Sequence, residues 1–289
     1  MAIVNGHTKT LGLIGNPVAH TLSPVIHNEL AEIYNHNLVY LPFQVDTSLE
    51  DAIKGAGAMH FGGLNITVPY KTDVISHLVE IDDFAKRIGA VNTLVPVQGG
   101  FKGYNTDIPG LYRSMQSDGV SLENEKVIIL GAGGAGRSIA MLALDKGAEC
   151  VYLLNRTLSK AQAVAEEVNR YAGASFVTPM ALSEYEKLSG CRYLCIQATS
   201  VGLFPNVEKL PIEEDGFYDL IHTGYDIIYN PYETAFMSKV KAHGGQAYNG
   251  LKMLLYQGII AYELWNNISV SQEAAEQVLQ KLKEALGLS

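Results

Sequence analysis

The sequence predicts an α/β protein with two domains, and three observations lead to this prediction. Short apolar runs alternate with segments of helical periodicity along the chain, which is the pattern of sheets with parallel strands and covering helices. A polar, glycine-bearing stretch at 97–103 interrupts the pattern. After Asn124 the alternation begins again, and its first strand leads directly into a glycine-rich turn. We therefore place a domain boundary near residue 107.

The first domain is expected to contain three strands, at 11–14, 39–45 and 64–68. A helix is expected at 24–34. Ser23 is a suitable N-cap for this helix, and Pro24 suits the first helical position because no amide hydrogen is needed there.

The second domain is expected to contain more strands, each followed by a helix or a loop. The strands are expected at 127–130, 151–154, near Phe176, and at 193–198, 226–228 and 246–248. Helices are expected at 136–146 and 159–171. Two further helices, at 252–266 and 271–286, end the chain and are free to pack back on the first domain.

Composition and charge exclude several classes of protein. The chain has 289 residues and a formal net charge of −9, which argues against a broad basic surface for nucleic acid. It shows no signal peptide and no apolar run of membrane-spanning length, so we expect a cytoplasmic protein without a membrane partner. Its three cysteines suit a reducing compartment, and Cys191 and Cys195 are interpreted as buried apolar side chains rather than metal ligands. No cluster at ligand spacing suggests a metal site.

The glycine-rich turn predicts a dinucleotide site. The segment 131–136 fits the pattern G-x-G-x-x-G between a strand and a helix. Gly131 permits the tight turn, Gly133 lets the backbone approach a pyrophosphate, and Gly136 allows close packing of helix and strand. The free amides of the helix N-terminus would then face the anion. The alternative is a loop whose glycines serve packing alone.

The end of the next strand indicates which dinucleotide binds. NAD sites usually carry an acidic residue there, which accepts hydrogen bonds from the ribose. Here the strand ends in Asn155-Arg156-Thr157 without a carboxylate, and the Arg156 guanidinium can bind a 2′-phosphate. These residues favour NADP, although Arg156 can also be read as a solvated surface residue.

Four polar clusters in the first domain indicate a substrate site. Thr21 and Ser23 lie two residues apart at the mouth of a helix, where neutral hydroxyls and the helix dipole can bind a carboxylate. The alternative for Ser23 is an N-cap alone. Asn65 and Thr67 alternate to one face of a strand whose other face is formed by Ile66 and Val68.

The remaining clusters contain charged and amide side chains. Lys71 follows a strand at the carboxyl edge, where α/β sheets place their ligands. Asn92 lies in the segment 90–93, and Asp107 ends the segment 103–107. Because Asp107 precedes a helical pattern, a plain N-cap is the alternative interpretation of this carboxylate.

Taken together, these motifs resemble the shikimate dehydrogenase family. The matching segments run in order, at family-like spacing, from about residue 11 to Trp265: 15–17, 20–28, 65–71, 90–93, 103–107, 131–138, 155–157, 198–202, 226–231, and 249–251 through Gln257. The resemblance implies NADPH-dependent reduction of 3-dehydroshikimate to shikimate, a step toward chorismate and the aromatic amino acids. It also implies an α/β substrate domain of residues 1–106 and 251–289, and a Rossmann-type, doubly wound NADP-binding domain of residues 107–250.

The resemblance also implies roles for individual residues. Lys71 and Asp107 would be the catalytic pair. Thr21 and Ser23 would bind the substrate carboxylate. Asn65, Asn92 and Gln257 would hold the ring hydroxyls, with Thr67 nearby. Tyr229 would be a further substrate-binding residue, lining the cleft near the nicotinamide. The cofactor-binding residues would be Gly131, Gly133, Gly134, Ala135, Gly136, Asn155, Arg156, Thr157, Lys160, Thr199, Ser200 and Gly250.

One departure from the family pattern leaves alternatives open. Ordinary members have serine at both positions of the carboxylate pair, whereas this chain has Thr21 at the first. The threonine methyl group can tilt or tighten the pocket, so a dual quinate/shikimate dehydrogenase stays an alternative. A catalytically silent, metabolite-sensing relative is a second one, which the presence of both Lys71 and Asp107 disfavours. The resemblance leaves open a monomer or a homodimer, and whether Lys71 or Asp107 transfers the proton.

Overall fold

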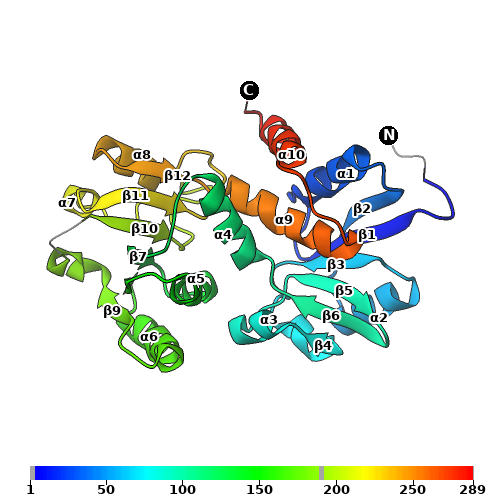
Figure 1. The fold of residues 1–289 in the computed structure, drawn as a ribbon, viewed down its shortest axis with the longest axis horizontal. Coiled ribbons are helices and arrows are strands. Elements are labelled where there is room, and N and C mark those ends of the chain that lie inside the picture. The colour runs from blue at the N-terminus through cyan, green and yellow to red at the C-terminus, as the bar shows by residue number, and fades with distance from the viewer. Residues whose placement is uncertain (1–3, 189–191, 289) are drawn as a thin grey trace. The chain divides into compact units, whose positions relative to one another are not determined.

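The chain folds into two compact α/β units. The structure is a computed structural model that describes residues 4–188 and 192–288. One unit comprises Met1–Leu111 and Leu254–Ser289, and the other comprises Tyr112–Met253. The sequence predicted boundaries after residues 106 and 250, and the two units divide a few residues later, after Leu111 and Met253. The predicted two-domain α/β class is confirmed (Figure 1).

The first unit is built on a six-stranded mixed sheet with the order β2-β1-β3-β5-β6-β4. The strands are β1 (Lys9–Gly15), β2 (Leu38–Gln44), β3 (Gly63–Ile66), β4 (Glu80–Ile81), β5 (Thr93–Val97) and β6 (Gly100–Tyr104). β1 pairs in parallel with β2 and β3, but β5 is antiparallel to both β3 and β6. The polar stretch at 97–103 is therefore part of a hairpin, in which Gly99 has a φ of 87° that glycine adopts without strain.

Helices surround this sheet. They are α1 (Ser23–Ile33), α2 (Leu49–Ala58), the 3-10 helix η1 (Asp73–His77), α3 (Asp83–Ile88), the start of α4 (Asp107–Ser117), most of α9 (Leu251–Asn266), and α10 (Gln272–Ala285). α10 packs beside α1, and the Ser271 amide donates a hydrogen bond to the Tyr34 hydroxyl (Figure 1). The C-terminal helices thus return to the first unit.

Two local predictions for the first unit are wrong. The N-cap of α1 is Leu22, without a side-chain capping bond, and Ser23 is the first helical residue. The helix begins one residue early because the Thr21 hydroxyl accepts the Ser23 amide. The strand expected at 64–68 ends at Ile66, and Val68 is 65% exposed in the following turn instead of buried.

The second unit contains a fully parallel sheet with the order β12-β11-β10-β7-β8-β9. Its strands are β7 (Lys126–Leu130), β8 (Cys150–Asn155), β9 (Val177–Ala181), β10 (Tyr193–Gln197), β11 (Ile221–Asp226) and β12 (Gln246–Tyr248). Its remaining helices are α5 (Gly134–Asp145), α6 (Leu158–Ala172), η2 (Leu182–Lys187), α7 (Asp215–Tyr218) and α8 (Ala235–Ala242). The chain order reverses between β7 and β10, as in doubly wound dinucleotide-binding folds.

The strand predicted at 226–228 is wrong in position, because β11 ends at Asp226. This buried strand was not predicted in full, because an apolar run is interrupted in it by His222, Thr223 and Gly224. α5 begins at Gly134 rather than Gly136, so the helix starts inside the glycine pattern. Cys195 is fully buried, as expected, and burial raises the pKa of its thiol. Cys191 lies outside the described residues.

An aromatic cluster connects α1, β2 and α9 in the first unit. The buried His27 ring stacks on Tyr40 at a centroid distance of 4.1 Å and also contacts Trp265 and Tyr262. Trp265 is fixed by a 2.9 Å bond from its indole nitrogen to the Leu94 carbonyl oxygen. Neither ring nitrogen of His27 has a hydrogen-bond partner, and burial lowers the pKa of this imidazole to about 3.

Replacing His27 with phenylalanine is expected to remove an acid-sensitive contribution to stability. The pKa of His27 is lower in the folded than in the unfolded state, so the unfolded chain takes up the proton first as the pH falls below about 6.5. The free energy of unfolding of the wild type should therefore fall by about 2 kcal/mol more than that of His27→Phe between pH 6.5 and pH 5. Urea unfolding at both pH values measures this difference. The exposed His60→Asn serves as the control, and parallel pH profiles for wild type and His27→Phe would contradict the prediction.

Candidate active site

Lys71 and Asp107 form an ion pair in the first unit. Lys71 follows the turn after β3, and Asp107 is the first residue of α4. The Lys71 Nζ atom lies 2.7 Å from Asp107 Oδ2. The two side chains are 33% and 23% exposed, so the pair is partly shielded yet open to a ligand. The structure brings together the two residues that the sequence predicts as the catalytic pair.

The Asp107 carboxylate is held in place on its other side by Asn92. Its Oδ1 atom accepts a 2.9 Å hydrogen bond from Asn92 Nδ2. The interpretation of Asp107 as a plain helix cap is wrong, because both its oxygens bind side chains and Asn105 Oδ1 accepts the Ile108 amide. The helix N-terminus still favours a negative charge at this position.

Asn92 is itself almost fully buried, at 2% exposed, and its orientation is fixed by hydrogen bonds with Thr93, Thr106 and Asp107. Its Nδ2 atom donates to Thr106 Oγ1 and to Asp107, and its Oδ1 atom accepts the Thr106 amide at 2.7 Å. Both amide protons are therefore used within the protein. Contact of Asn92 with a substrate hydroxyl stays a prediction, whereas its contact with Asp107 is direct.

Thr21 and Ser23 lie together at the N-terminus of α1. The Thr21 hydroxyl donates to Ser23 Oγ at 3.2 Å, and Ser23 is 7% exposed. Two adjacent hydroxyls at the positive end of a helix can donate to a carboxylate.

Asn65 of β3 is buried beside β5, the strand that begins directly after Asn92. Its Oδ1 atom accepts a 2.7 Å hydrogen bond from the Tyr40 hydroxyl, and its Nδ2 atom donates to the Thr93 hydroxyl and the Asn92 carbonyl oxygen. Both donors are thus occupied. The remaining lone pair of Oδ1 is available to accept a bond from a ligand hydroxyl.

The other two predicted substrate contacts, Thr67 and Gln257, lie in the same unit. Thr67 follows β3, and its amide donates to the Ile14 carbonyl oxygen. Gln257 on α9 donates from its side chain to the Leu254 carbonyl oxygen of its own helix. A Cβ atom at Gly110 would lie 2.6 Å from the Gln257 backbone nitrogen, so glycine is required where α4 approaches α9.

The glycine-rich turn between β7 and α5 has the geometry of an anion cradle. Gly131 has a φ of 105°, and its amide donates to the Leu154 carbonyl oxygen. A Cβ atom at Gly136 would lie 1.8 Å from the Gly131 carbonyl oxygen, so turn and helix are in backbone contact. Cβ atoms at Gly133 and Gly134 would meet nothing within 4 Å, which leaves this side of the turn open. Ala135 lies in the same first turn of α5.

The end of β8 supports this turn and presents polar side chains beside it. Asn155 Oδ1 accepts the Ala132 amide at 3.1 Å, so this residue positions the loop backbone. Arg156, Thr157 and Lys160 follow and are exposed. Arg137, at the start of α5, is paired with Glu167 instead of facing a ligand.

A cavity of about 410 Å³ lies in the second unit beyond β10 and β11. Thr199, Ser200 and Tyr229 are among its lining residues, and burial raises the pKa of the Tyr229 phenol. Thr199 also contacts the glycine turn, because a Cβ atom at Gly131 would lie 2.7 Å from its methyl group. Gly250 packs against the same loop, where a Cβ atom would lie 2.0 Å from the Ile227 carbonyl oxygen.

A buried carboxylate fixes the loop that carries Tyr229. Asp226 accepts hydrogen bonds from the Ile228 amide and, at 2.7 Å, from the Thr234 hydroxyl. Burial raises the pKa of this carboxyl to about 6, and these hydrogen bonds offset part of the rise. Sequence reasoning placed Asp226 in a motif but gave it no role.

The residues of the second unit fit an NADP molecule. The open glycine turn and the first amides of α5 suit its pyrophosphate. The exposed Arg156, Thr157 and Lys160, at a strand end without a carboxylate, suit its 2′-phosphate. In the sheet order, β8 lies on one side of β7 and β10 lies on the other. The cavity beside Tyr229 lies beyond β10, away from β8, and suits the nicotinamide end.

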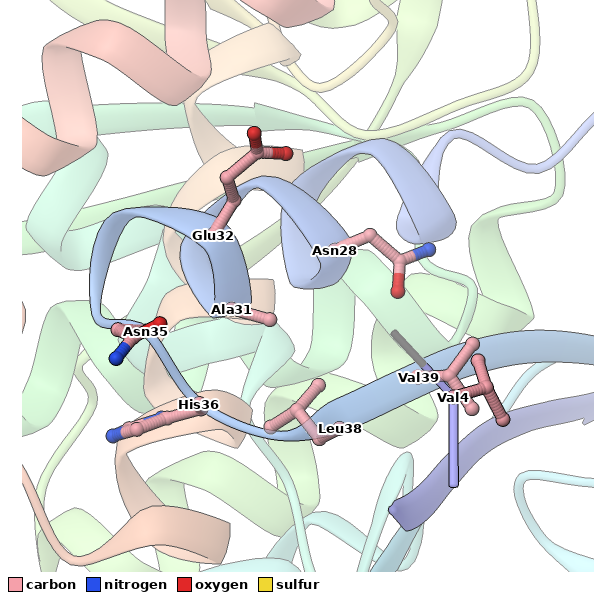
Figure 2. A pocket seen from close by; sticks show the side chains of 8 residues that line it. All are labelled: Val4, Asn28, Ala31, Glu32, Asn35, His36, Leu38 and Val39. Atoms are coloured by element: carbon pink, nitrogen blue, oxygen red, sulfur yellow. The ribbon is translucent and has the colours of Figure 1, made fainter. Parts of the chain in front are cut away.

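A further hollow in the first unit carries few ionisable side chains. A hollow of about 520 Å³ lies between α1, β2 and Val4 in the first unit (Figure 2). Of its described lining residues, Glu32 and His36 are the ionisable ones. Within residues 4–188 and 192–288, no group of three or more potential ligands could hold a metal ion, and no helix is long and apolar enough to cross a bilayer.

Sequence reasoning missed two residues that the structure places within the polar network of the first unit. Tyr40 bonds Asn65 from the neighbouring part of the sheet, and the buried Thr106 bonds Asn92. Tyr40 lies in an apolar strand without a motif, so its sequence carries no signal for this role. Thr106 lies next to Asp107 in a polar cluster, which was a usable signal.

Comparisons with known proteins match all parts of this architecture. The family model "Shikimate dehydrogenase substrate binding domain" matches residues 13–94, "Shikimate / quinate 5-dehydrogenase" matches 113–189, and "Shikimate 5'-dehydrogenase C-terminal domain" matches 250–280. A shikimate dehydrogenase (NADP(+)) of Carboxydothermus hydrogenoformans is 38% identical, with 99% of each chain covered.

Solved structures give the same result. The shikimate 5-dehydrogenase of Thermus thermophilus, in complex with NADP(H) and shikimate, is 31% identical with a TM-score of 0.82, over 95% of this chain and 99% of that one. The enzyme of Listeria monocytogenes, in complex with shikimate and NAD, is 29% identical with a TM-score of 0.87, over 96% and 99% of the two chains. The resemblance inferred from the sequence motifs is confirmed, and the chain belongs to the shikimate dehydrogenase family.

Proposed function

We propose that this protein catalyses the reversible, NADP-dependent interconversion of shikimate and 3-dehydroshikimate. The observation that carries the proposal is the ion pair between Lys71 and Asp107, which Asn92 holds in position in the substrate unit. The names of the relatives, shikimate dehydrogenase (NADP(+)), support it.

The ion pair suits reduction of a ketone. Negative charge builds on the carbonyl oxygen as a hydride reaches the carbon, and an ammonium within hydrogen-bonding distance stabilises this charge. Lys71 would provide this ammonium and Asp107 would orient it. In the oxidation direction the single hydroxyl proton would pass to one member of the pair, either the Lys71 amine in its neutral form or the Asp107 carboxylate.

The hydroxyls of Thr21 and Ser23 would bind the substrate carboxylate. The Thr21 hydroxyl, which donates to Ser23 Oγ at 3.2 Å, would turn its proton to the carboxylate, and both hydroxyls lie at a helix N-terminus that favours an anion. Asn65 would accept a bond from a ring hydroxyl, with Thr67 and Gln257 completing the site.

The cofactor would be held entirely by the second unit. The backbone of 131–136 would bind the pyrophosphate, and Arg156 with Thr157 and Lys160 would bind the 2′-phosphate. Thr199, Ser200, Tyr229 and Gly250 would line the nicotinamide end. Bound NADP supplies the hydride acceptor, or the donor when reduced.

Quinate is the second candidate substrate, because the family model matching 113–189 names both substrates and Thr21 departs from the usual serine. We further propose that the enzyme works in the cytoplasm, as a monomer or homodimer, and does not bind nucleic acid, in line with its net charge of −9.

A spectrophotometric assay at about 340 nm that crosses shikimate and quinate with NADP and NAD tests the proposed function. We expect shikimate with NADP to give the highest kcat/KM, by about tenfold or more over NAD, because Arg156 pairs with the 2′-phosphate. A preference for NAD would refute the cofactor assignment. No turnover of shikimate with either cofactor would refute the function and favour a sensing role.

Lys71→Ala is expected to lower kcat by about 100-fold or more, because the developing oxyanion loses its cation. KM for shikimate should change only a few-fold, since carboxylate and hydroxyl contacts remain. Steady-state kinetics measure both. Lys54→Ala, which removes an exposed lysine paired with Glu50, is the matched control and should behave as wild type. Near-normal turnover of Lys71→Ala would rule out the assigned role.

Two alanine substitutions in the glycine turn are expected to have different effects, one on the stability of the fold and the other on cofactor binding. Gly136→Ala places a Cβ atom against the Gly131 carbonyl oxygen and should lower the melting temperature by several degrees. Gly133→Ala meets no protein atom and should leave the melting temperature nearly unchanged, yet weaken NADP binding about tenfold by obstructing the pyrophosphate. Thermal melts and titration with NADP check both outcomes. Equal melting temperatures for the two variants would contradict the packing argument.

A further inference from the structure

A buried tyrosine of β2 contacts the substrate site. Tyr40 is fully buried, and its hydroxyl donates a 2.7 Å hydrogen bond to Asn65 Oδ1. Burial raises the pKa of this phenol. The phenol therefore contacts one of the amides assigned to the ring hydroxyls.

Tyr40 supplies the hydrogen bond to the oxygen end of the Asn65 carboxamide. A carboxamide can rotate by half a turn with little change in shape, so its neighbours must distinguish oxygen from nitrogen. The Asn92 carbonyl oxygen can only accept, so it fixes the nitrogen end, and the Tyr40 hydroxyl donates to the oxygen end. Without the phenol donor, Asn65 Oδ1 would lose the hydrogen bond that holds it in the folded protein.

Two neighbouring residues of α1 hold Tyr40 in turn. Asn28 Oδ1 accepts the Tyr40 amide at 2.8 Å, and Asn28 Nδ2 donates to the Tyr40 carbonyl oxygen at 3.1 Å. These bonds replace a strand partner at the outer edge of β2, and Figure 2 shows the Asn28 side chain reaching from α1 toward this strand. The preceding residue, His27, stacks on the Tyr40 ring.

The polar contacts continue from Asn65 to the ion pair. Thr93 accepts from Asn65 and bonds both Thr106 and Asn92. Asn92 then bonds Asp107, which pairs with Lys71. A single connected network thus runs from Tyr40 through Asn65 to the proposed catalytic groups.

We propose that Tyr40 is a positioning residue for the substrate, which holds the carboxamide oxygen of Asn65 in place. This inference rests on the proposed function of the same site. Tyr40 does not touch the reacting atoms, so its loss weakens substrate binding more than it slows turnover. His27 and Asn28 serve the same site through Tyr40.

Tyr40→Phe keeps the ring and its stacking on His27 but removes the hydroxyl. We expect KM for shikimate to rise about tenfold, with kcat within about threefold of wild type and KM for NADP unchanged. The matched control is Tyr262→Phe, which removes another buried hydroxyl of the same unit, bonded to His36 at 2.6 Å. The control should lose similar stability in a thermal melt while KM for shikimate stays at the wild-type value.

A double-mutant cycle separates action through Asn65 from a general loss of packing. If Tyr40 acts through Asn65, Tyr40→Phe should raise KM much less in an Asn65→Ala background than in wild type. Equal KM values for Tyr40→Phe and Tyr262→Phe would overturn the inference, and so would full additivity with Asn65→Ala. In either case turnover of shikimate by wild type would leave the proposed function intact, whereas an inactive wild type would overturn both.

Asn28→Ala decides the question if Tyr40→Phe does not fold. This substitution frees the Tyr40 backbone without removing a buried hydroxyl, and we expect it to raise KM for shikimate several-fold at unchanged KM for NADP. An unchanged KM for shikimate would overturn the inference.

Discussion

The substrate unit depends on the burial of one carboxamide, that of Asn92. Its hydrogen bonds to Thr106 and Asp107 join the start of β5 to the start of α4, and they fix the carboxylate that pairs with Lys71. A buried amide with both protons donated has a single favourable orientation, because any rotation leaves polar atoms unpaired at a cost of about 1–3 kcal/mol each. The geometry of the ion pair is therefore set by the core, which allows a partly exposed lysine to be held at a defined place.

The cofactor unit depends on a different constraint, the contact between two backbone segments. Turn and helix meet so closely at Gly131 and Gly136 that no side chain fits between them. The same contact leaves Gly133 and Gly134 facing open space, where an anion can approach the first amides of α5. Asn155 ties this turn to the end of β8, so the residues that indicate NADP and the residues that suit pyrophosphate form one rigid piece.

Much of the fold was predictable because the sequence repeats a strong local pattern. The strands at β1, β2, β7, β8 and β12 were expected within a few residues of their observed positions. The errors arose where tertiary contacts outweigh local preference. The Thr21 hydroxyl takes the Ser23 amide and moves the start of α1, and β11 is buried despite containing His222, Thr223 and Gly224. The antiparallel pairing of β5 was not predicted either, because the alternation of strands and helices indicated parallel strands.

By itself the sequence determined the α/β class, the dinucleotide turn and the resemblance to the family, because these rest on glycines and polar residues at fixed spacing, and the resemblance in turn implied the charged pair. Only the tertiary structure decided how those residues are used. It placed Asn92 on Asp107, and it brought Tyr40 against Asn65 although 25 positions separate them along the chain. The contact between Tyr40 and Asn65 depends on the strand order, because β2 and β3 lie on either side of β1, and no local pattern around Tyr40 records that order. The two charged residues were thus implied by the family resemblance, and the network that orients them was visible only in the fold.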